Sequence, residues 1–496
     1  MSDEITESLS EEKSAQPTLL LTGCVRDLVR APLVTLLETL SIREAAQRMS
    51  TERVSAAVIL AAAGQVTGIV TDWDLRERVV AAGLDTTQPI GTVMSAPVVS
   101  LAAAEPIYEA VRLMISHNIH HLLITSADRP LGLITSNDLI VLHSASVFFI
   151  TREIERQTSP AGLRQVLDQA QQAIPLLLRQ GVRASQIGWL MAEINDRLVS
   201  RVLEWTEASL GPPPVPYCWL VLGSEARREQ TFKTDQDNAL IYTDPPPESA
   251  GAVQAYFLEL GRQAVAGLVE AGFPPCAGHL TAANPQWVQP VSGWHAYFQQ
   301  WATRWEPDEE PNFLIFFDFR GVYGDFSLAK NLRRFIADLL EQHPRFLTRL
   351  AHLSASLPPP LSFLGQFVVE HNGEHKNELD LKQRGTVPLI DLARFFALRY
   401  HLTETNTVAR LEQLKDVKEL PDDLLHELAQ SFEFILNIRL RQQWEQLQAG
   451  QPLSNHVNPQ NLSTLDQVSL RQVFKAIAQA QAFLHQAYHL KVGRLY

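Results

Sequence analysis

Cysteine is scarce in this chain, and basic residues are fewer than acidic ones. The three cysteines, Cys24, Cys218 and Cys276, are widely spaced, so the sequence predicts neither a disulfide framework nor a zinc site and suits a reducing compartment. Lys and Arg total 42 against 55 Asp and Glu, which gives a net charge of −13. Because general nucleic-acid binding needs a basic surface, we do not expect it here.

Long hydrophobic runs are missing as well. No apolar stretch approaches the roughly 20 residues that a membrane-spanning helix needs, and residues 1–20 contain no signal-peptide core. We therefore expect a disordered tail over residues 1–20, no membrane partner and a cytoplasmic location. A length of 496 residues is typical of a protein with about three domains.

An internal repeat follows this tail. The phrase Ile42-Arg-Glu-Ala-Ala recurs as Ile107-Tyr-Glu-Ala-Val, and Gly68-Ile-Val-Thr-Asp-Trp-Asp-Leu recurs as Gly132-Leu-Ile-Thr-Ser-Asn-Asp-Leu. Apolar residues at helical spacing, followed by short β-branched runs, predict a helix, a strand, a turn, a strand and a helix in each copy.

The repeat resembles a tandem pair of CBS domains, which we place at residues 21–145. The resemblance implies a regulatory module for AMP, ADP or ATP. In such a module Thr71 and Thr135 contact phosphate, and Asp74 and Asp138 accept the ribose hydroxyls. The alternative is that the two threonines only cap the helices that follow them.

Residues 146–216 carry apolar side chains at helical spacing, for example Leu163, Val166 and Leu167. The consecutive prolines of 211–216 (GPPPVP) forbid a helix and mark a boundary. We therefore expect residues 146–216 to form a helical connector that also offers a dimer surface. Since paired CBS modules commonly associate, the resemblance implies a homodimer.

Two aspartates one residue apart, Asp235 and Asp237, follow a Gly223-Ser224 turn, and an apolar run lies on either side of this stretch. In an extended strand such side chains point to the same face. Adjacent carboxylates repel unless a positive charge lies between them, and a hard cation such as Mg²⁺ or Mn²⁺ holding an NTP is the natural candidate. Glycine allows the backbone to approach a phosphate closely.

The same stretch resembles the nucleotidyltransferase superfamily typified by DNA polymerase β, and more closely the uridylyltransferase that modifies the PII protein. The pattern G-x-x-x-R-x-E followed by [ST]-D-x-D is met by Gly223, Arg227, Glu229, Thr234, Asp235 and Asp237. The phrases GSEARREQ and TDQDNAL are similar to those of a bacterial signal-transduction family with paired CBS domains, a transferase-like domain and a helical domain. Gln236 departs from the apolar residue usual between the aspartates.

This resemblance implies a third metal-binding carboxylate on another strand of a domain spanning residues 217–355. The expected ligand is Asp318, inside an apolar run expected to be a strand, because a lone buried acid is costly unless it is paired or binds metal. Asp325 is the second choice, and Arg320 could neutralise Asp318 or face phosphate.

Two arginines beside the glycine turn are further candidates. Arg227 and Arg228 are expected to bind phosphate, as is Thr234. The alternative for both arginines is an ion pair with Glu225 or Glu229.

Residues 356–496 read as helical and resemble the substrate-binding domain that follows the transferase in that family, with the phrases DLKQRG and DLAR. Lys382 and Arg384 are expected to contact nucleotide or acceptor, and the alternative is a solvated loop.

The expected fold is therefore multidomain α/β and α: a tandem CBS module, a polymerase β-like α/β domain with a mixed sheet, and a C-terminal helical bundle. The expected function is Mg²⁺-dependent nucleotidyl transfer from an NTP to a hydroxyl on a protein or a small molecule, regulated by adenine nucleotide at the CBS pair. The alternatives are a non-catalytic adenine-nucleotide sensor and a partner-binding regulator that needs no ligand.

Overall fold

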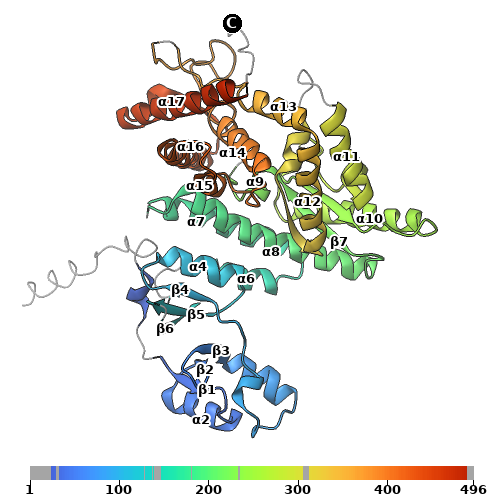
Figure 1. The fold of residues 1–496 in the computed structure, drawn as a ribbon, viewed down its shortest axis with the longest axis vertical. Helices are drawn as coiled ribbons and strands as arrows, with labels where there is room; N and C mark the ends of the chain where they lie inside the picture. The colour runs from blue at the N-terminus through green and yellow to red at the C-terminus, as the bar shows by residue number, and fades with distance from the viewer. Residues whose placement is uncertain are drawn as a thin grey trace, which may run out of the picture. The chain divides into compact units, whose positions relative to one another are not determined.

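The computed structural model describes residues 24–29, 33–127, 129–136, 138, 147–179, 181–232, 235–276, 278–304, 312–362 and 364–488. The chain divides into two units. The first runs to Thr151, and the second contains nearly all of the chain from Arg152 onward. Figure 1 gives the order of the elements along the chain.

The first unit contains the two repeats. Each forms a three-stranded sheet in which a short leading strand pairs in parallel with the middle strand, and the middle strand pairs antiparallel with the last. The elements of this unit are η1 (Val25–Leu28), β1 (Thr35–Leu37), α2 (Ile42–Glu52), β2 (Ala56–Leu60), β3 (Val66–Thr71), α3 (Asp72–Asp74), η2 (Leu75–Ala81), η3 (Ile90–Thr92), β4 (Ser100–Ala102), α4 (Ile107–Ser116), β5 (His121–Ser126) and β6 (Arg129–Thr135).

The helical spacing of the repeat becomes the core of this unit. Ile42 and Met49 on α2 pack with Ile59 of β2 and Val70 of β3, as expected for an amphipathic helix on a sheet. The predicted helix–strand–strand order is present in both repeats, each with one additional strand, β1 or β4, in front. The closing helix predicted for the second repeat falls largely outside the described residues.

The second unit begins with long helices and a mixed sheet. Its first elements are α7 (Pro160–Arg179), α8 (Ala184–Leu210), β7 (Tyr217–Leu222), α9 (Gly223–Ala226), β8 (Asn238–Tyr242), α10 (Ala250–Glu270), η4 (Pro285–Trp287), β9 (Val288–Pro290), α11 (Val291–Arg304), η5 (Asn312–Phe317), β10 (Phe319–Gly324), α12 (Phe326–Gln342) and α13 (Pro344–Ser354). Between the two units, α6 (Val147–Arg156) spans the division.

The sheet has the order β10-β7-β8-β9, with β8 and β9 parallel and the other pairs antiparallel. Every residue of β7 and β8 is buried, because central strands covered on both faces are apolar throughout. The mixed sheet expected from the sequence is confirmed.

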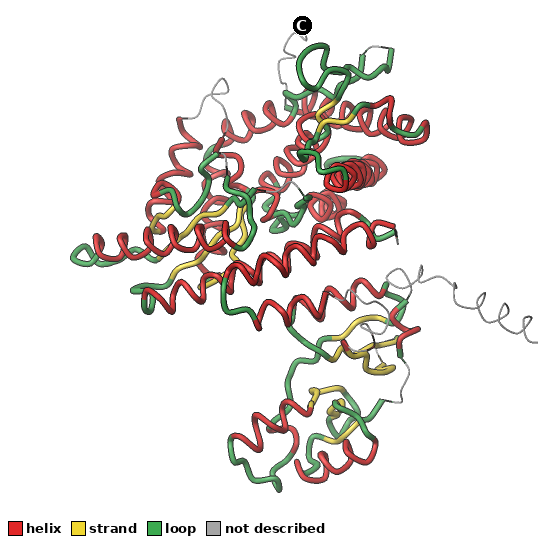
Figure 2. The backbone as a smooth tube through the Cα atoms, turned by 180° about the vertical axis from the view of Figure 1, so that it is seen from behind, coloured by secondary structure: helices red, strands yellow, loops and turns green. Residues whose placement is uncertain are grey.

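The last part of the second unit is mainly helical, as Figure 2 shows in red. Its elements are β11 (Leu379–Asp380), η6 (Lys382–Thr386), α14 (Val387–Arg399), α15 (Thr407–Val417), α16 (Asp422–Gln448), β12 (His456–Val457), η7 (Pro459–Asn461) and α17 (Thr464–Ala487). None of the helices in the described part of the chain combines the length and apolarity that crossing a bilayer requires.

Two features differ from the expectations. The stretch expected to be a connector is packed into the second unit, since α8 lies against α7, α10, α16 and β10. The apolar run before Asp318 forms the 3₁₀ helix η5, and β10 begins only at Phe319. Periodicity cannot separate a short apolar strand from a short apolar helix.

Candidate functional site

A glycine turn joins β7 to the short helix α9. Gly223 adopts a φ of +55°, and a Cβ at this position would lie 2.9 Å from Ile315 Cδ1 and 3.6 Å from Asp237 Oδ2. Both the backbone angle and the crowding therefore require glycine. The Gly223 N–H already donates to the carbonyl oxygen of Asp318 at 2.9 Å, so it is the N–H groups of Ser224 and Glu225, in the first turn of α9, that lack intrahelical acceptors.

The paired aspartates lie beside this turn. Asp235 is exposed and Asp237 is half-buried, whereas Gln236 between them is buried, as the alternation of an extended chain predicts. Burial, together with the charge of Asp235, raises the pKa of Asp237 to about 6. The Cys276 thiol opposes this shift by donating a hydrogen bond to Asp237 Oδ1 at 3.1 Å.

The C-terminal helical region contributes a cation to the same place. Loss of solvent around the ammonium group and the charge of Arg439 lower the pKa of Lys382, whereas the carboxylates of Asp237 and Asp235 raise it. Lys382, at the start of η6, therefore lies within electrostatic range of both aspartates. It was one of the two C-terminal residues expected at the site.

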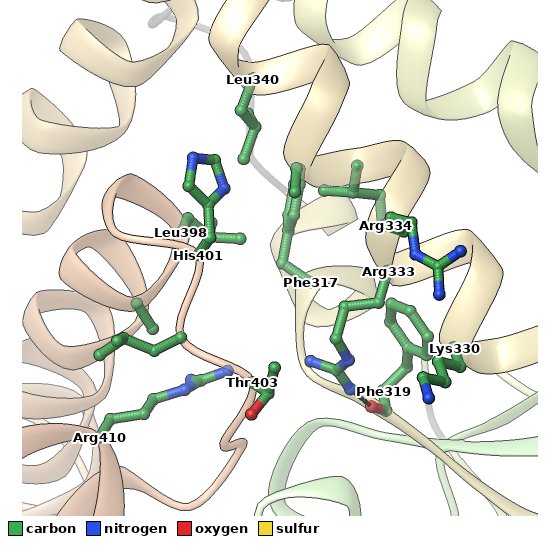
Figure 3. Close-up of a pocket in the computed structure, with 14 residues that line it drawn as sticks. Phe317, Phe319, Lys330, Arg333, Arg334, Leu340, Leu398, His401, Thr403 and Arg410 are labelled. Carbon is green, nitrogen blue, oxygen red and sulfur yellow. Dashed lines mark hydrogen bonds between the residues drawn. The ribbon is translucent and has the colours of Figure 1, made fainter. Parts of the chain in front are cut away.

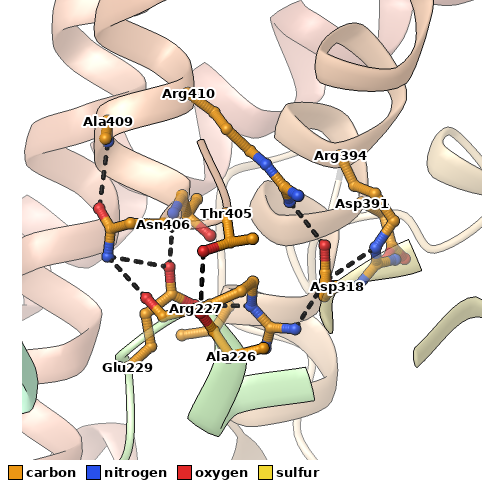
Figure 4. A network of polar contacts seen from close by, with 12 residues as sticks. Ala226, Arg227, Glu229, Asp318, Asp391, Arg394, Thr405, Asn406, Ala409 and Arg410 are labelled. Carbon is orange, nitrogen blue, oxygen red and sulfur yellow. Dashed lines mark hydrogen bonds and ion pairs between the residues drawn. The ribbon is translucent and has the colours of Figure 1, made fainter. Parts of the chain in front are cut away.

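Asp318 has a different environment from the one expected. Its side chain is fully buried, and Oδ2 accepts hydrogen bonds from Arg227 Nη1 at 2.7 Å and from Arg394 Nη2 at 2.7 Å. Arg410 Nη1 lies 2.7 Å from the other oxygen, Oδ1. Figure 4 shows the three guanidinium groups around this one carboxylate.

We name this set the Asp318 cluster: Asp318, Arg227, Arg394 and Arg410. These arginine charges hold the pKa of Asp318 well below its usual range, against the opposing effect of its burial. Since both carboxylate oxygens lie against arginines, the expectation that Asp318 is the third metal ligand is not met. The second choice, Asp325, instead accepts a hydrogen bond from the Ser327 N–H at 2.9 Å as the N-cap of α12.

The arginines near the turn form ion pairs. Arg227 Nε lies 2.8 Å from Glu229 Oε2, and Arg228 Nη1 lies 3.0 Å from Glu193 Oε1 on α8. The alternative of an ion pair with Glu229 is therefore the observed one for Arg227, while Arg228 pairs with an acid that the sequence did not suggest.

Three further expectations concern residues near these arginines. Arg320 Nη2 donates a hydrogen bond to Asp196 Oδ1 on α8 at 2.9 Å. Arg320 therefore neutralises the charge of Asp196 and not that of Asp318. Arg384 donates a long hydrogen bond, 3.5 Å, to the carbonyl of Pro358. Thr234 lies outside the described residues.

Glu225 is an acid near the site that sequence reasoning treated only as an ion-pair partner. It is buried in α9, its Oε1 has no hydrogen-bond partner, and burial raises its pKa to about 8, helped by the charges of Asp196 and Asp237. In the sequence, only the position of Glu225 two residues after Gly223 indicated that it lies near the site.

The described residues contain no group of three or more His, Cys, Asp or Glu side chains placed to hold a metal ion. A pair of carboxylates is nevertheless a suitable donor set for Mg²⁺, because this ion is usually held by one or two carboxylates together with substrate phosphates. Asp235 and Asp237 thus fit the ion that the superfamily resemblance implies.

The predicted ligand residues of the first unit form two similar capping boxes. Asp74 Oδ2 accepts from the Thr71 N–H and hydroxyl at 2.9 and 2.7 Å, and Asp138 Oδ2 accepts from those of Thr135 at 2.7 and 2.6 Å. The capping alternative therefore describes both threonines in this structure.

The two repeats differ in what surrounds the aspartate. Asp74 is buried, and its Oδ1 accepts from Ser95 Oγ at 3.2 Å and lies 3.3 Å from Arg78 Nη2. Asp138 and Thr135 instead line a cleft of about 230 Å³. In this cleft His121 Nε2 lies 3.0 Å from Ser55 Oγ.

Comparison with known protein families matches three models to successive parts of the chain. The CBS domain model matches residues 25–81 and 90–143. The model described as "Putative nucleotidyltransferase DUF294" matches residues 168–308, and the one described as "Putative nucleotidyltransferase substrate binding domain" matches residues 344–488.

Individual relatives each match about a quarter of this chain. The CBS domain-containing protein YhcV of Bacillus subtilis is 31% identical over 117 residues, which are 24% of this chain and 83% of that protein. An uncharacterized protein of Methanopyrus kandleri is 26% identical over 134 residues, 27% of this chain and 68% of its own. A CBS domain protein of Pyrobaculum aerophilum, solved in complex with AMP, is 28% identical, with a TM-score of 0.24 and coverage of 26% of this chain and 97% of that one.

The repeats, their sheets and the matches to both halves of the second unit agree with one another. The chain belongs to the CBS domain-containing proteins, and its CBS pair is followed by the two regions that match "Putative nucleotidyltransferase DUF294" and "Putative nucleotidyltransferase substrate binding domain".

Proposed function

We propose that this protein is a Mg²⁺- or Mn²⁺-dependent nucleotidyltransferase that moves a nucleoside monophosphate from an NTP to a hydroxyl group. One observation carries the proposal: the Asp235 and Asp237 pair lies beside the Gly223 turn, where the two carboxylates interact electrostatically with each other and with Lys382. The resemblance to the PII uridylyltransferase favours UTP or ATP as donor, and a protein tyrosine or a small-molecule hydroxyl as acceptor.

In this reaction the acceptor hydroxyl loses its proton to water and its oxygen bonds to the α-phosphorus. The bond from that phosphorus to the oxygen that bridges to the β-phosphate breaks, and pyrophosphate leaves with that electron pair. Asp235 and Asp237 would hold the divalent cation, which neutralises phosphate charge. Lys382 places a second positive charge on the same side. Ser224 offers its hydroxyl and N–H to a phosphate oxygen at the start of α9.

The test incubates the full-length protein with labelled ATP, UTP, CTP or GTP and Mg²⁺ in a bacterial lysate. We expect label on a discrete acceptor, and a loss of about 100-fold or more in Asp235→Asn/Asp237→Asn, because the cation's stabilisation of the transferred group would be gone. Asp338→Asn, an exposed acid on α12, is the matched control and should retain full transfer.

Labelling that persists in the double variant, or that never appears with any of the four nucleotides, would defeat the proposal as an enzyme. The second outcome would favour a non-catalytic nucleotide sensor. One observation supports that candidate: Asp318, expected to complete the metal site, is held by three arginines. Saturable binding of NTP and Mg²⁺ without turnover is its distinguishing result.

We also propose that adenine nucleotide binds the CBS pair in the cleft that residues of both repeats line. The cleft lined by Thr135 and Asp138 supports this assignment, whereas the carboxylate of Asp74 is already engaged by Ser95 and Arg78. Calorimetry with AMP, ADP and ATP on the full-length protein should show binding that Asp138→Asn weakens. Asp85→Asn, an exposed acid in the same unit, should leave it unchanged, and no heat with any of the three would overturn the assignment.

A further inference from the structure

A second cavity lies in the transferase unit, between α12 and the segment that joins α14 to α15. Its volume is about 270 Å³. Figure 3 shows Phe317 and Phe319 along one wall, with Leu398 and His401 on the other side. None of Asp235, Asp237 and Lys382 lines it, so it is distinct from the proposed transferase site.

The lining of this cavity is strongly cationic. Lys330, Arg333 and Arg334 come from α12 and Arg410 from α15, and no carboxylate is among the described lining residues. Figure 3 shows the guanidinium groups of Arg333 and Arg410 pointing toward each other, with Thr403 between them. Four positive side chains around one small cavity repel one another unless an anion neutralises them.

The hydrogen-bond and ion-pair partners of the half-buried Arg333 and the buried Arg410 do not remove this excess of positive charge. Arg333 Nη2 donates to the carbonyl oxygen of Phe319 at 2.6 Å, which supplies no charge. Burial lowers the pKa of Arg333 to about 10, and the charge of Arg410 lowers it further, against the opposing charges of Asp318 and Glu404. Arg410 lies 2.7 Å from Asp318 Oδ1, but that carboxylate is shared with two other arginines.

The rest of the cavity wall is apolar. Phe317, Ile336, Leu340 and Leu398 belong to it, so an occupant would have one charged end and one hydrophobic end. The cavity volume lies just below the common range for drug-sized ligands, about 300–1,000 Å³, so the cavity suits a small ligand. Arginine side chains match the geometry of phosphate oxygens, and a phosphate dianion neutralises more of the positive charge than a single carboxylate does.

We propose that this cavity binds a small phosphorylated organic molecule, with the phosphate between Arg333 and Arg410 and an aromatic or aliphatic body against Phe317 and Leu398. The site goes beyond the proposed transfer reaction, because it uses none of that reaction's residues. Its ligand is a second small molecule recognised by the catalytic unit itself, separate from any nucleotide at the CBS pair.

The test is calorimetry on the full-length protein with phenyl phosphate as the probe, in buffer containing EDTA to keep divalent cations away from Asp235 and Asp237. We expect saturable binding at one site. Phenol lacks the anion and inorganic phosphate lacks the apolar body, so each should bind at least about tenfold more weakly.

Two exposed cations allow the site to be altered without disturbing the Asp318 cluster. Lys330→Glu/Arg334→Glu should weaken phenyl phosphate at least about tenfold through charge reversal. Arg345→Glu, an exposed arginine on α13 outside the cavity, is the matched control and should bind as the parent does.

Three results would overturn the proposal: no saturable binding of phenyl phosphate, unchanged affinity in Lys330→Glu/Arg334→Glu, or loss of binding in Asp235→Asn/Asp237→Asn. The last result would place the probe at the transferase site. Because the transfer assay and this titration use different residues, either proposal can fail while the other stands.

Discussion

Two acids beside the glycine turn bind protons more tightly than exposed acids do. Burial raises the pKa of Asp237 to about 6 and that of Glu225 to about 8. At neutral pH Asp237 is therefore mostly ionised, and Glu225 is mostly protonated. A carboxylate that must lose its proton before it can bind a cation makes the affinity for that cation depend on pH.

Binding of Mn²⁺ to the protein should therefore weaken in mild acid. Below about pH 6 each bound ion must displace a proton from Asp237, so we expect the Kd to rise about tenfold per pH unit. Electron paramagnetic resonance of free Mn²⁺ between pH 7.5 and 5 measures this. Asp237→Asn should bind weakly at every pH, and a constant Kd in the parent protein would exclude Asp237 as a ligand.

The second prediction at this scale concerns Gly223. Gly223→Ala places a side chain at φ +55° and 2.9 Å from Ile315 Cδ1, so we expect a loss of at least about 1–2 kcal/mol in the free energy of unfolding. Gly251→Ala in α10, where a Cβ meets nothing within 4 Å, should instead stabilise by about 0.4–1 kcal/mol. Urea denaturation of both variants measures the difference, and equal effects would show that the turn is not strained by a side chain.

At the scale of elements, the Asp318 cluster and its neighbours dock the C-terminal helices onto the mixed sheet β10-β7-β8-β9. Arg394 of α14 and Arg410 of α15 contact Asp318, the residue just before β10. The N-terminal end of α15 adds hydrogen bonds, since the Thr405 hydroxyl donates to the carbonyl of Ala226 at 2.8 Å and the Asn406 amide donates to that of Arg227 at 2.9 Å. The end of α9 is thereby held both by the start of α15 and by the Arg227–Asp318 contact.

Removing the central charge should loosen this docking. Asp318→Asn leaves three buried guanidinium groups without their shared carboxylate, and we expect a loss of about 3–5 kcal/mol. Because the pKa of Asp318 is held below its unfolded value, its contribution should be present above about pH 4 and lost in stronger acid. Urea denaturation followed by tryptophan fluorescence measures the loss.

Asp325→Ala serves as the comparison, because it removes only an exposed helix cap, worth about 0.5–2 kcal/mol. A cost for Asp318→Asn no larger than that for Asp325→Ala would show that the cluster contributes little to stability.

These elements also show what the sequence could and could not predict. The alternating burial of residues 235–237 could be predicted because it depends only on the local spacing along an extended chain. Asp318 was expected to bind a metal ion, but its carboxylate is paired with arginines, and its partner Arg394 lies 76 residues away on another helix. Local pattern contains no information about which distant cations reach a buried acid.

At the scale of the whole molecule, the chain divides into two units with separate cores. The repeats were visible in the sequence because each copies the same phrases, and the mixed sheet was implied by the resemblance to the polymerase β-like superfamily. The packing of α8 with the transferase elements was not visible, because an amphipathic helix shows that one face is buried and not which partner covers it.

Two cores should give two thermal transitions in the full-length protein. Trp73 is in the first unit and every other tryptophan follows residue 188, so fluorescence reports mainly on the second unit while calorimetry detects both. Ile59→Ala, a fully buried residue of the first core, should cost about 2–5 kcal/mol and lower only the transition that fluorescence does not follow. Phe432→Ala, fully buried on α16, should lower only the fluorescence-detected transition. Equal shifts of both transitions by either substitution would mean that the chain unfolds as one cooperative body.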